Sequence, residues 1–412
     1  MKYMGSKREL LEKIEQIIDK RLTSEKALLD IFAGTCGVGV YLRDKYPIYS
    51  NDVQLYSKVI SEGTIEVQPE QVTIERIWPL LEENFSKNYK FVSKKLADYL
   101  QQSNAFREIE RWDENDLEKY LKFIETIPSP LNHSSKKPNS KWIIEEYNIQ
   151  NKKGRSFPYV QTTFLFSEMY FSLDQAIVID SLKYAIDNLS MEFGNLAKIL
   201  NVALIHSYSY SSAGTGHFAQ FRDLSTLSSV TDVFLYRTRS VQDYFLKKAE
   251  EIINASKINK YHTKSKSFNS DYRELLKNDS VMKKVGLIYA DPPYTFVHYS
   301  RFYHAIENLC RYDYPIVEHK GRYRTDRHQS PFCIKTQAPS AFKEILVKSS
   351  KYNIPVLISY SNTGMITLSQ IESIAHEHGY KTTLVEVDHR HSTMGRLKDK
   401  DRNVKEALLL CH

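Results

Sequence analysis

Cysteine is scarce in this sequence, and its distribution argues against a metal centre built on thiolates. Four cysteines occur among 412 residues, at Cys36, Cys310, Cys333 and Cys411. Their spacing matches no pattern of paired metal ligands, and scattered thiols of this kind remain reduced in the cytosol. We therefore expect free thiols in a cytoplasmic protein and no bound metal.

Long hydrophobic runs are absent as well. No stretch reaches the roughly 18 apolar residues of a membrane-spanning helix, and the first residues, Met1-Lys2-Tyr3, carry no apolar core of a signal peptide. The sequence therefore predicts neither a membrane partner nor secretion. With 42% apolar residues the chain can bury substantial cores, and its length suits two or three domains.

Charge of one sign is only slightly in excess. Lysine and arginine number 57 against 50 aspartate and glutamate residues, which gives a net charge of +7. This excess is compatible with a polyanionic partner but does not establish one. Evidence for function must therefore come from individual motifs.

The most informative stretch that the sequence does contain is Asp291-Pro292-Pro293-Tyr294. It follows the apolar residues 285–290, which predict a buried strand, so it would lie at the carboxyl edge of a sheet, where open α/β folds bind ligands. Two successive prolines fix the backbone and remove its donors, which leaves carbonyls pointing outward. A carboxylate, a carbonyl and an aromatic ring can together hold a flat base by its exocyclic amine. A strand followed by a plain Pro-Pro turn is the simpler alternative.

A glycine-rich turn lies far upstream of this tetrapeptide. The apolar residues 27–32 predict a strand that runs into Gly34, Gly37 and Gly39. Glycines allow a tight strand-to-helix turn and let a cofactor approach the backbone. The spacing differs from both the dinucleotide fingerprint and the phosphate-binding loop, so a plain tight turn remains the alternative.

A carboxylate follows the glycine turn at the distance expected for a second strand. Residues 46–52 form a short predicted strand that ends in Asp52. A carboxylate at the end of the second strand is where a ribose diol is usually bound. This position makes Asp52 a candidate cofactor ligand.

Together these motifs resemble those of Dam-like N6-adenine DNA methyltransferases of the alpha group. The resemblance includes residues 2–7, whose sequence Lys-Tyr-Met-Gly-Ser-Lys is similar to the amino-terminal cofactor motif of that family. The order of the motifs is that of the alpha group: the glycine motif comes first, then a long insertion, then the catalytic tetrapeptide. The motifs cover residues 1–60 and 265–412 well and the middle of the chain poorly.

The resemblance implies roles for individual residues. It makes Asp291, Pro292, Pro293 and Tyr294 catalytic. It implies S-adenosyl-L-methionine as cofactor, with the acid that ends residues 268–271 touching its adenine. The implied cofactor-binding residues are Lys2, Tyr3, Gly5, Ser6, Lys7, Asp30, Phe32, Ala33, Gly34, Gly37, Gly39, Asp52 and Asp271. Lys7 is also a candidate DNA contact.

The implied fold is an α/β, Rossmann-like methyltransferase with a large inserted domain. We expect the core to comprise residues 1–61 and 262–412, and the insertion, a DNA target-recognition domain, to comprise residues 62–261. Helical periodicity over residues 78–125 and 172–205 makes this insertion mainly helical.

Several core elements are predicted directly from periodicity and capping signals. Residues 8–20 have the apolar spacing of a helix, and Ser172 with Gln175 forms a capping box within the insertion. Three apolar runs late in the chain predict strands that complete the sheet with an antiparallel edge: residues 354–360, 381–387 and 406–410.

Two segments are candidates for contact with DNA. A basic loop holds Arg322 and Arg324, which suit contact with phosphate; a solvated charge run is the alternative. Residues 206–222 contain glycines and small polar residues, and Gln220 and Arg222 are typical readers of adenine and guanine. A linker without specificity is nearly as good an interpretation of this second segment.

The function implied by the resemblance is methylation of the N6 amine of a flipped-out adenine at a specific site in double-stranded DNA. Such an enzyme would be the modification component of a restriction–modification system, with a separate cognate endonuclease. A bacterial or phage protein of this kind would be cytoplasmic and nucleoid-associated. The alternatives are a methyltransferase for the N4 amine of cytosine in DNA or for adenine in RNA, and a catalytically inactive DNA-binding protein of the same fold.

Overall fold

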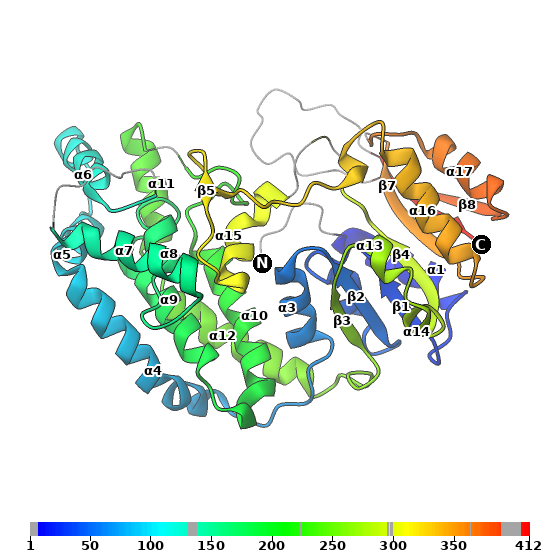
Figure 1. Cartoon of the computed structure of the whole chain (residues 1–412), viewed down its shortest axis with the longest axis horizontal. Helices are drawn as coiled ribbons and strands as arrows, with labels where there is room; N and C mark the ends of the chain where they lie inside the picture. Colours follow the sequence, from blue (N-terminus) through cyan, green and yellow to red (C-terminus); the bar gives the residue numbers. More distant parts are fainter. Residues whose placement is uncertain are drawn as a thin grey trace. The chain divides into compact units, whose positions relative to one another are not determined.

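A computed structural model of the chain describes residues 7–130, 138–222, 224–294, 296, 300–362, 364–388 and 405–412. These residues form two compact units, whose elements are labelled in Figure 1. The helical unit consists of Glu70–Asn254 and Arg301–Arg327, and the sheet unit consists of the remaining described residues. None of the described helices is long and apolar enough to cross a membrane.

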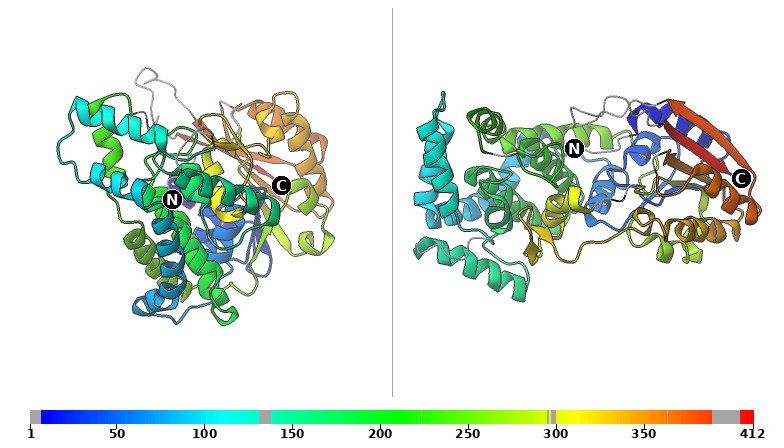
Figure 2. Two further views of the ribbon diagram at one scale, coloured as in Figure 1. Left: turned by 60° about the vertical axis from the view of Figure 1, so that its left-hand side comes forward. Right: turned by 90° about the horizontal axis from the view of Figure 1, so that it is seen from above.

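The sheet unit is built on a seven-stranded sheet in the order β3-β2-β1-β4-β7-β9-β8. The strands are β1 (Ala27–Asp30), β2 (Ile48–Asp52), β3 (Lys266–Asn269), β4 (Val285–Ala290), β7 (Val356–Ser361), β8 (Thr382–Asp388) and β9 (Lys405–Cys411). The first five in this order pair in parallel, from β3 to β7. Strand β9 is antiparallel to both β7 and β8. Strands β8 and β9 lie side by side at the edge of the sheet, in orange and red (Figure 2).

This sheet confirms the α/β class and the strands predicted from sequence, including the antiparallel edge. The central strands are buried along their whole length, because helices pack on the faces of a mostly parallel sheet. Near-continuous apolar runs were therefore the correct signal for these strands.

Short helices connect and cover the strands. They are η1 (Arg8–Leu10), α1 (Leu11–Asp19), α2 (Gly37–Leu42), α3 (Leu55–Thr64), α13 (Tyr272–Leu275), α14 (Asp279–Met282), η3 (Pro331–Cys333), α16 (Ala338–Ser350) and α17 (Leu368–Glu377). One core cluster joins inward-facing residues of the central strands, such as Ile288 and Ile358, to Phe342 and Ile345 of α16. This core fixes the strands whose ends carry the candidate site.

The helical unit contains α4 (Ile74–Lys95), α5 (Ala97–Arg107), α6 (Glu114–Thr126), α7 (Pro138–Lys153), α8 (Gln161–Phe166), α9 (Leu173–Asp187), η2 (Met191–Phe193), α10 (Gly194–Ser211), α11 (Leu227–Arg237), α12 (Val241–Ser256), most of α15 (Ser300–Arg311), and a hairpin of β5 (Val317–Glu318) and β6 (Tyr323–Arg324). Helix α9 packs against α4, α8 and α10, and it is buried on nearly all sides. The predicted capping box starts it: the Gln175 amide donates to Ser172 Oγ (3.2 Å), and the Ser172 amide donates to Gln175 Oε1 (3.0 Å).

A buried carboxylate ties four helices of this unit together. Glu168 accepts hydrogen bonds from Ser103 Oγ (2.6 Å), Tyr120 Oη (2.6 Å) and the Leu173 amide (2.8 Å), and it pairs with Arg237 Nη1 (2.7 Å). Burial raises the pKa of Glu168 to about 7, although the hydrogen bonds from Ser103 and Leu173 oppose this rise. The group is therefore held at the junction of α5, α6, α9 and α11 by several donors, as a buried acid requires.

Two boundaries differ from those predicted. Helix α10 continues to Ser211, so Tyr208 is a buried helical residue and the expected loop of residues 206–222 begins only at Ser212. The structure also places Arg301–Arg327 in the helical unit, whereas the predicted division assigned all residues from 262 onward to the core. In both places the boundary depends on contacts between residues distant in sequence, which local periodicity does not report.

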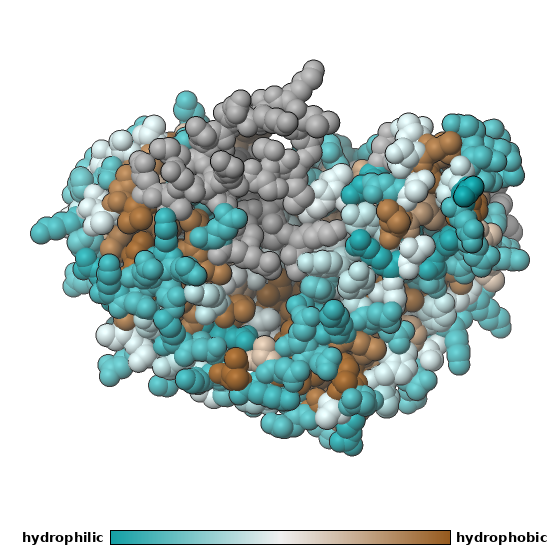
Figure 3. All heavy atoms as spheres, turned by 180° about the vertical axis from the view of Figure 1, so that it is seen from behind, coloured by the Kyte–Doolittle hydropathy of each residue, from teal (hydrophilic) through white to brown (hydrophobic). Residues whose placement is uncertain are grey.

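The surface that Figure 3 shows is mostly hydrophilic, with hydrophobic side chains in separate patches.

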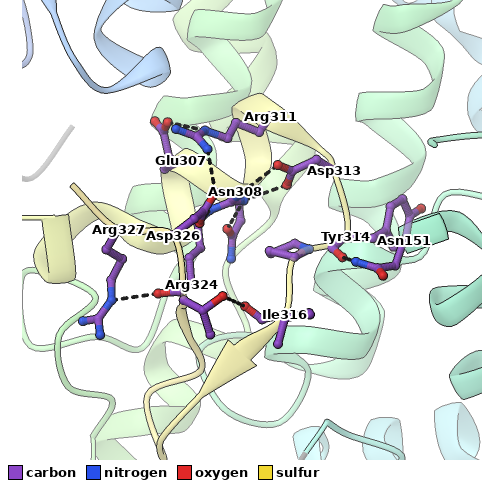
Figure 4. A network of polar contacts seen from close by, with 12 residues as sticks. Asn151, Glu307, Asn308, Arg311, Asp313, Tyr314, Ile316, Arg324, Asp326 and Arg327 are labelled. Atoms are coloured by element: carbon purple, nitrogen blue, oxygen red, sulfur yellow. Dashed lines mark hydrogen bonds and ion pairs between the residues drawn. The ribbon is translucent and has the colours of Figure 1, made fainter. Parts of the chain in front are cut away.

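Arg324 lies at the centre of a polar network in the segment after α15 (Figure 4). Its guanidinium donates to Asp313 (2.6 and 2.8 Å), Asp326 (2.9 and 2.9 Å) and Asn308 Oδ1 (3.0 Å), so all five of its donors are occupied. The side chain is 5% exposed. Nearby, Asn151 Nδ2 of α7 donates to the Tyr314 carbonyl (2.6 Å). Arg324 therefore fastens the hairpin to α15 and the chain that follows it.

We expect Arg324→Ala to lower the free energy of unfolding by about 1.5–3 kcal/mol, the contribution of hydrogen bonds to charged groups. Arg324→Lys should recover little, because an ammonium cannot occupy five planar donor positions. The measurement is urea denaturation of the full chain. Arg155→Ala is the matched control, since Arg155 is 46% exposed and pairs with Asp187 at the surface. Equal stability of the Arg324→Ala variant and the control would contradict this role.

Candidate functional site

The carboxyl ends of five parallel strands meet at one edge of the sheet. Because β3, β2, β1, β4 and β7 run in the same direction, the residues that end β1, β2 and β4 lie along this edge. These are Asp30, Asp52 and, directly after Ala290, the tetrapeptide that begins at Asp291. The predicted cofactor and catalytic motifs, about 260 positions apart in the sequence, are therefore neighbours in the fold.

The glycine turn uses two residues in the left-handed backbone region. Gly34 has φ 52° and Cys36 has φ 59°, and α2 starts at the next residue, Gly37. A Cβ added at Gly39 would lie 2.8 Å from Ile65 Cδ1 and 3.0 Å from Ile48 Cγ2, so a larger residue would require these side chains to shift. Close packing therefore keeps this turn tight, and the backbone of the turn lies next to the ends of the strands.

Asp52 holds this turn in place. Its carboxylate accepts hydrogen bonds from the amides of Gly34 (3.0 Å) and Gln54 (2.9 Å). The side chain of the preceding residue, Asn51, exchanges hydrogen bonds with the backbone of Ser270 after β3 (3.0 and 3.2 Å). Both residues therefore connect neighbouring strand ends, and the half-buried Asp52 carboxylate is fixed at the edge where a ribose would lie.

Asp30 is placed differently from Asp52. It is 2% exposed and accepts one hydrogen bond from the Phe32 amide (3.3 Å). Burial raises its pKa well above the usual range, and the charge of Asp291 adds to the effect. Asp30 is therefore a buried acid at the end of β1, close to the carboxylate of Asp291.

An aromatic cluster flanks the same edge. The half-buried ring of Phe32 lies 5.4 Å from the ring of Tyr272 and 5.2 Å from that of Phe332. Phe32 was predicted as a cofactor residue, but Tyr272 and Phe332 were missed. No periodicity marks them, since they come from a short helix and a 3-10 turn. Tyr272 and Phe332 are buried and support the ring of Phe32, which is the part-exposed member of the cluster and the one open to a flat partner.

Asp271 caps α13 and is already paired. Its carboxylate accepts hydrogen bonds from Arg273 Nε (3.0 Å) and Nη2 (2.8 Å), and its pKa is lowered chiefly by this partner. The side chain remains 26% exposed at the end of β3. Its contact with a cofactor adenine stays a prediction.

At the tetrapeptide, Asp291 binds the ammonium of Lys7. Lys7 Nζ lies 3.2 Å from Asp291 Oδ1 and 3.1 Å from each carboxylate oxygen of Glu406. Burial alone would lower the pKa of Lys7, but attraction to Asp291 and Glu406 raises it above its usual value. Lys7, predicted to bind cofactor and DNA, is therefore a charged partner of Asp291, the acid predicted to be catalytic.

Tyr294 lies against the same group. Lys7 Nζ is 5.9 Å from the centre of its ring, and the ring of Tyr360 is 5.7 Å away. Burial raises the pKa of Tyr294, and its hydroxyl donates a hydrogen bond to Glu406. Just before it, the Pro293 carbonyl accepts from Cys333 Sγ (3.7 Å). Glu406 is the residue that the sequence analysis missed here, although an acid at the start of an apolar strand was a visible signal.

The four predicted cofactor residues Lys2, Tyr3, Gly5 and Ser6 lie outside the described residues. Ala33 is described, and its amide donates to the Asn51 carbonyl (2.9 Å). The described candidates thus form one continuous set along the sheet edge.

The candidate DNA contacts other than Lys7 lie in the helical unit, and most of them are engaged there. Arg222 pairs with Asp232 and stacks 4.8 Å above the ring of Tyr236. Arg322 donates to the Leu165 carbonyl, and burial lowers its pKa to about 10. These groups, like Arg324, hold the unit together, so we no longer expect Arg322 and Arg324 to contact phosphate. Gln220 is exposed.

The comparison with known families gives one match. Residues 3–154 match the model of the D12 class N6 adenine-specific DNA methyltransferases. This range includes the amino-terminal motif, the glycine turn and Asp52, and it extends into the helical unit. No solved structure matches the chain.

Three curated relatives match most of the chain. Modification methylase LlaI of Lactococcus lactis subsp. lactis is 26% identical over 91% of the chain, type II methyltransferase M.FokI of Planomicrobium okeanokoites 23% over 99%, and modification methylase StsI of Streptococcus sanguinis 25% over 92%. The matches cover 48%, 51% and 46% of these proteins, so the chain spans about half the length of its curated relatives. The resemblance inferred from the motifs is confirmed: residues 3–154 are similar to the D12 class N6 adenine-specific DNA methyltransferases, and most of the chain is similar to modification methylases of type II.

Proposed function

We propose that the chain transfers a methyl group from S-adenosyl-L-methionine to the exocyclic N6 amine of an adenine at a specific site in double-stranded DNA. The observation that carries this proposal is the position of Asp291–Tyr294 at the same sheet edge as the glycine turn and Asp52. A cofactor site and a base-binding motif side by side are what a transfer between two bound molecules requires. In a restriction–modification system the chain would act in modification, with cleavage by a separate endonuclease.

The residues at the edge fit this cofactor. Asp52 and the tight glycine turn suit a ribose diol and an approaching backbone, and the part-exposed ring of Phe32, supported by Tyr272 and Phe332, suits a purine ring. The outward carboxylate of Asp291 suits a sulfonium cation nearby. When bound, the cofactor supplies an already activated methyl group, so the protein need only hold donor and acceptor in line.

The tetrapeptide suits an amine acceptor. An adenine amine is a poor nucleophile because its lone pair is conjugated with the ring, and hydrogen bonds from its protons to fixed acceptors free that lone pair. The Asp291 carboxylate and the Pro292 carbonyl can be these acceptors, a preorganised arrangement for the charge that develops on the amine. The amine is paired inside a duplex, so the base must be flipped out, and Tyr294 would then stack on it.

Other acceptors and another class of function remain to be tested. The same tetrapeptide would serve the N4 amine of cytosine or adenine in RNA, and a chain that binds DNA and cofactor without transfer would be a DNA-binding protein. Mapping of modified bases at single-base resolution, after incubation of unmodified DNA with the chain and cofactor, separates these cases. Methylation of cytosine, of RNA alone, or of nothing would overturn the proposal.

For the helical unit we propose the role of target recognition. The sheet unit's motifs need only the cofactor and one flipped base, so flanking bases must be read elsewhere. The segment from Ser212 to Arg222 carries the exposed Gln220 on a loop that is tied down by Arg222, whose Nε donates to the Gly214 carbonyl (3.4 Å). A rigid loop with an exposed amide is suited to reading adenine in the major groove.

Asp52→Ala should weaken S-adenosylmethionine binding by roughly 1.5–3 kcal/mol, because hydrogen bonds to a charged group are lost. Asp52→Asn should weaken it less, since one oxygen still accepts an amide hydrogen bond from the turn or from Gln54. Calorimetry of both variants, with the unfolding midpoint as a check on folding, gives the comparison. An unchanged affinity in folded Asp52→Ala would remove this residue from the cofactor site.

Asp291→Ala should keep cofactor binding while the single-turnover rate falls by roughly two orders of magnitude or more, as when a preorganised polar contact is lost. Tyr294→Ala should weaken base flipping, and Tyr294→Phe should be milder because the ring remains. Rapid-quench methylation on DNA with a mapped target is the measurement. A nearly normal rate for Asp291→Ala would refute the proposed chemistry.

Gln220→Ala should relax the preference for one base position by about 1–3 kcal/mol, with catalysis on the best site largely kept. Arg222→Ala should change the sequence profile too, but it should also lower stability, because Arg222 holds the loop through Gly214 and Tyr236. Relative methylation of a library with randomised flanks reports both effects. Identical profiles for wild type and Gln220→Ala would move recognition to another part of the helical unit.

A further inference from the structure

Glu406 reaches the catalytic edge because β9 runs against the other strands. It lies opposite Ser361, the last residue of β7, in the antiparallel pair. Since β7 is parallel to β4, the end of β7 and the start of β9 share the edge at which the tetrapeptide follows β4. An acid at the beginning of the last strand is thereby brought next to residues more than 100 positions earlier in the sequence.

Glu406 contacts both Lys7 and Tyr294. Both of its oxygens accept from Lys7 Nζ (3.1 Å each), which also binds Asp291, and its carboxylate accepts from the Tyr294 hydroxyl. The side chains of Glu406 and Lys7 are 2% and 8% exposed, whereas that of Asp291 is 21% exposed. Glu406 and Lys7 are thus interior groups, and Asp291 is the member that faces outward.

The charges of this group do not cancel. Two carboxylates and one ammonium leave a net charge of −1 where Lys7 is shared. Burying charged groups is costly, and an apolar trio would often be as stable, so stability alone does not explain the arrangement. A lysine paired with Asp291 alone would neutralise the acceptor, whereas a lysine shared with Glu406 leaves part of the negative charge on it.

We propose that Glu406 is a positioning residue of the transfer reaction. It holds Lys7 against Asp291 and fixes the Tyr294 ring, so that the acceptor and the stacking surface for the target base are set before the base arrives. This inference rests on the proposed function, which it deepens by assigning a role to a residue outside the known motifs.

The net charge also acts on the chemical step. The lone pair of the amine nitrogen forms the new N–C bond as the C–S bond breaks and its electron pair returns to sulfur. The nitrogen becomes positive until one of its protons passes to the Asp291 carboxylate and then to water. A site with net charge −1 stabilises this developing positive charge, and loss of the Glu406 charge removes that stabilisation.

Glu406→Gln tests the charge while keeping an oxygen that can accept from Lys7. We expect the single-turnover methylation rate to fall by about 10–100-fold, as when the group that orients a metal ligand is removed, with little change in cofactor or DNA affinity. The matched control is Glu372→Gln on α17, where the carboxylate accepts from Thr382 Oγ1 (3.5 Å) away from the tetrapeptide. The substrate is a DNA fragment in which the wild-type target has been mapped. Equal rates for the two variants would overturn the proposal.

Lys7→Met gives a readout that a purely structural role would not change. Asp291 and Glu406 then share a site without a cation, beside the buried Asp30 and the hydroxyl of Tyr294, so the pKa of one carboxylate rises, by roughly 1–3 units for one such charge. The rate should therefore be depressed most at low pH and recover as the pH rises, because the transfer needs ionised Asp291. In Lys7→Met with Glu406→Gln the shift should shrink, since one acid is gone. A wild-type pH profile for Lys7→Met, or an equal shift in the double variant, would contradict the shared ammonium.

The pairing can also be measured without catalysis. In Lys7→Met the raised carboxylate pKa means that stability is lost as the pH rises above the unfolded pKa, so its thermal midpoint should fall further below wild type between about pH 5 and about pH 8. The double variant should not show this fall. If the wild-type chain transfers no methyl group while these midpoints behave as expected, the proposed function fails and the ion pairing stands. If it transfers and the midpoints are flat, the inference about Glu406 fails.

Discussion

The parallel pairing of β3, β2, β1, β4 and β7 is the constraint on which the site depends. Parallel strands place all their carboxyl ends at one edge, and each connection must leave from there. The glycine turn, Asp52 and the tetrapeptide follow three such strands, so residues far apart in sequence become neighbours. The antiparallel β9 adds the one contribution that a parallel strand could not make at this edge, namely a side chain from its beginning.

Burial of charge explains much of the remaining organisation. One buried ionic group in each unit has several partners: Glu168 in the helical unit is bound by three donors and Arg237, and Lys7 in the sheet unit binds two carboxylates. Such groups are costly unless every donor and acceptor is used. Two properties therefore separate residues that could bind a ligand from residues that only stabilise the fold: the exposure of the side chain, and whether all of its hydrogen-bonding groups are already used. Arg324, with five occupied donors, is structural, whereas the half-buried Asp52 and the outward Asp291 retain a face toward the edge of the sheet.

The helical unit and the sheet unit divide the chain in a way that suits a division of labour. The sheet unit carries the described motifs for cofactor and amine, and the helical unit interrupts it twice, with Glu70–Asn254 and Arg301–Arg327. The second interruption begins at Arg301, seven positions after Tyr294 in the sequence. A segment that leaves the catalytic motif and enters the helical unit gives a covalent connection between the two tasks, which are proposed to be transfer and recognition.

The sequence by itself determined the elements and motifs whose signals are local. Apolar runs gave the strands, the glycine spacing gave the turn, the Ser172 capping box gave the start of α9, and strand-end positions brought Asp52 and Asp291 to one edge. These signals depend on residues within a few positions of each other. Tertiary structure alone decided which charged groups meet. Lys7 and Glu406 are 399 positions apart, and their contact depends on the order of β4, β7 and β9 in the sheet. Arg322 and Arg324 lie in a basic loop that suggested exposure. In the fold Arg322 donates to the Leu165 carbonyl, 157 positions away, and Arg324 is bound by Asp313, Asp326 and Asn308. The sequence shows the sign of such a charge, but only the fold shows which groups it contacts.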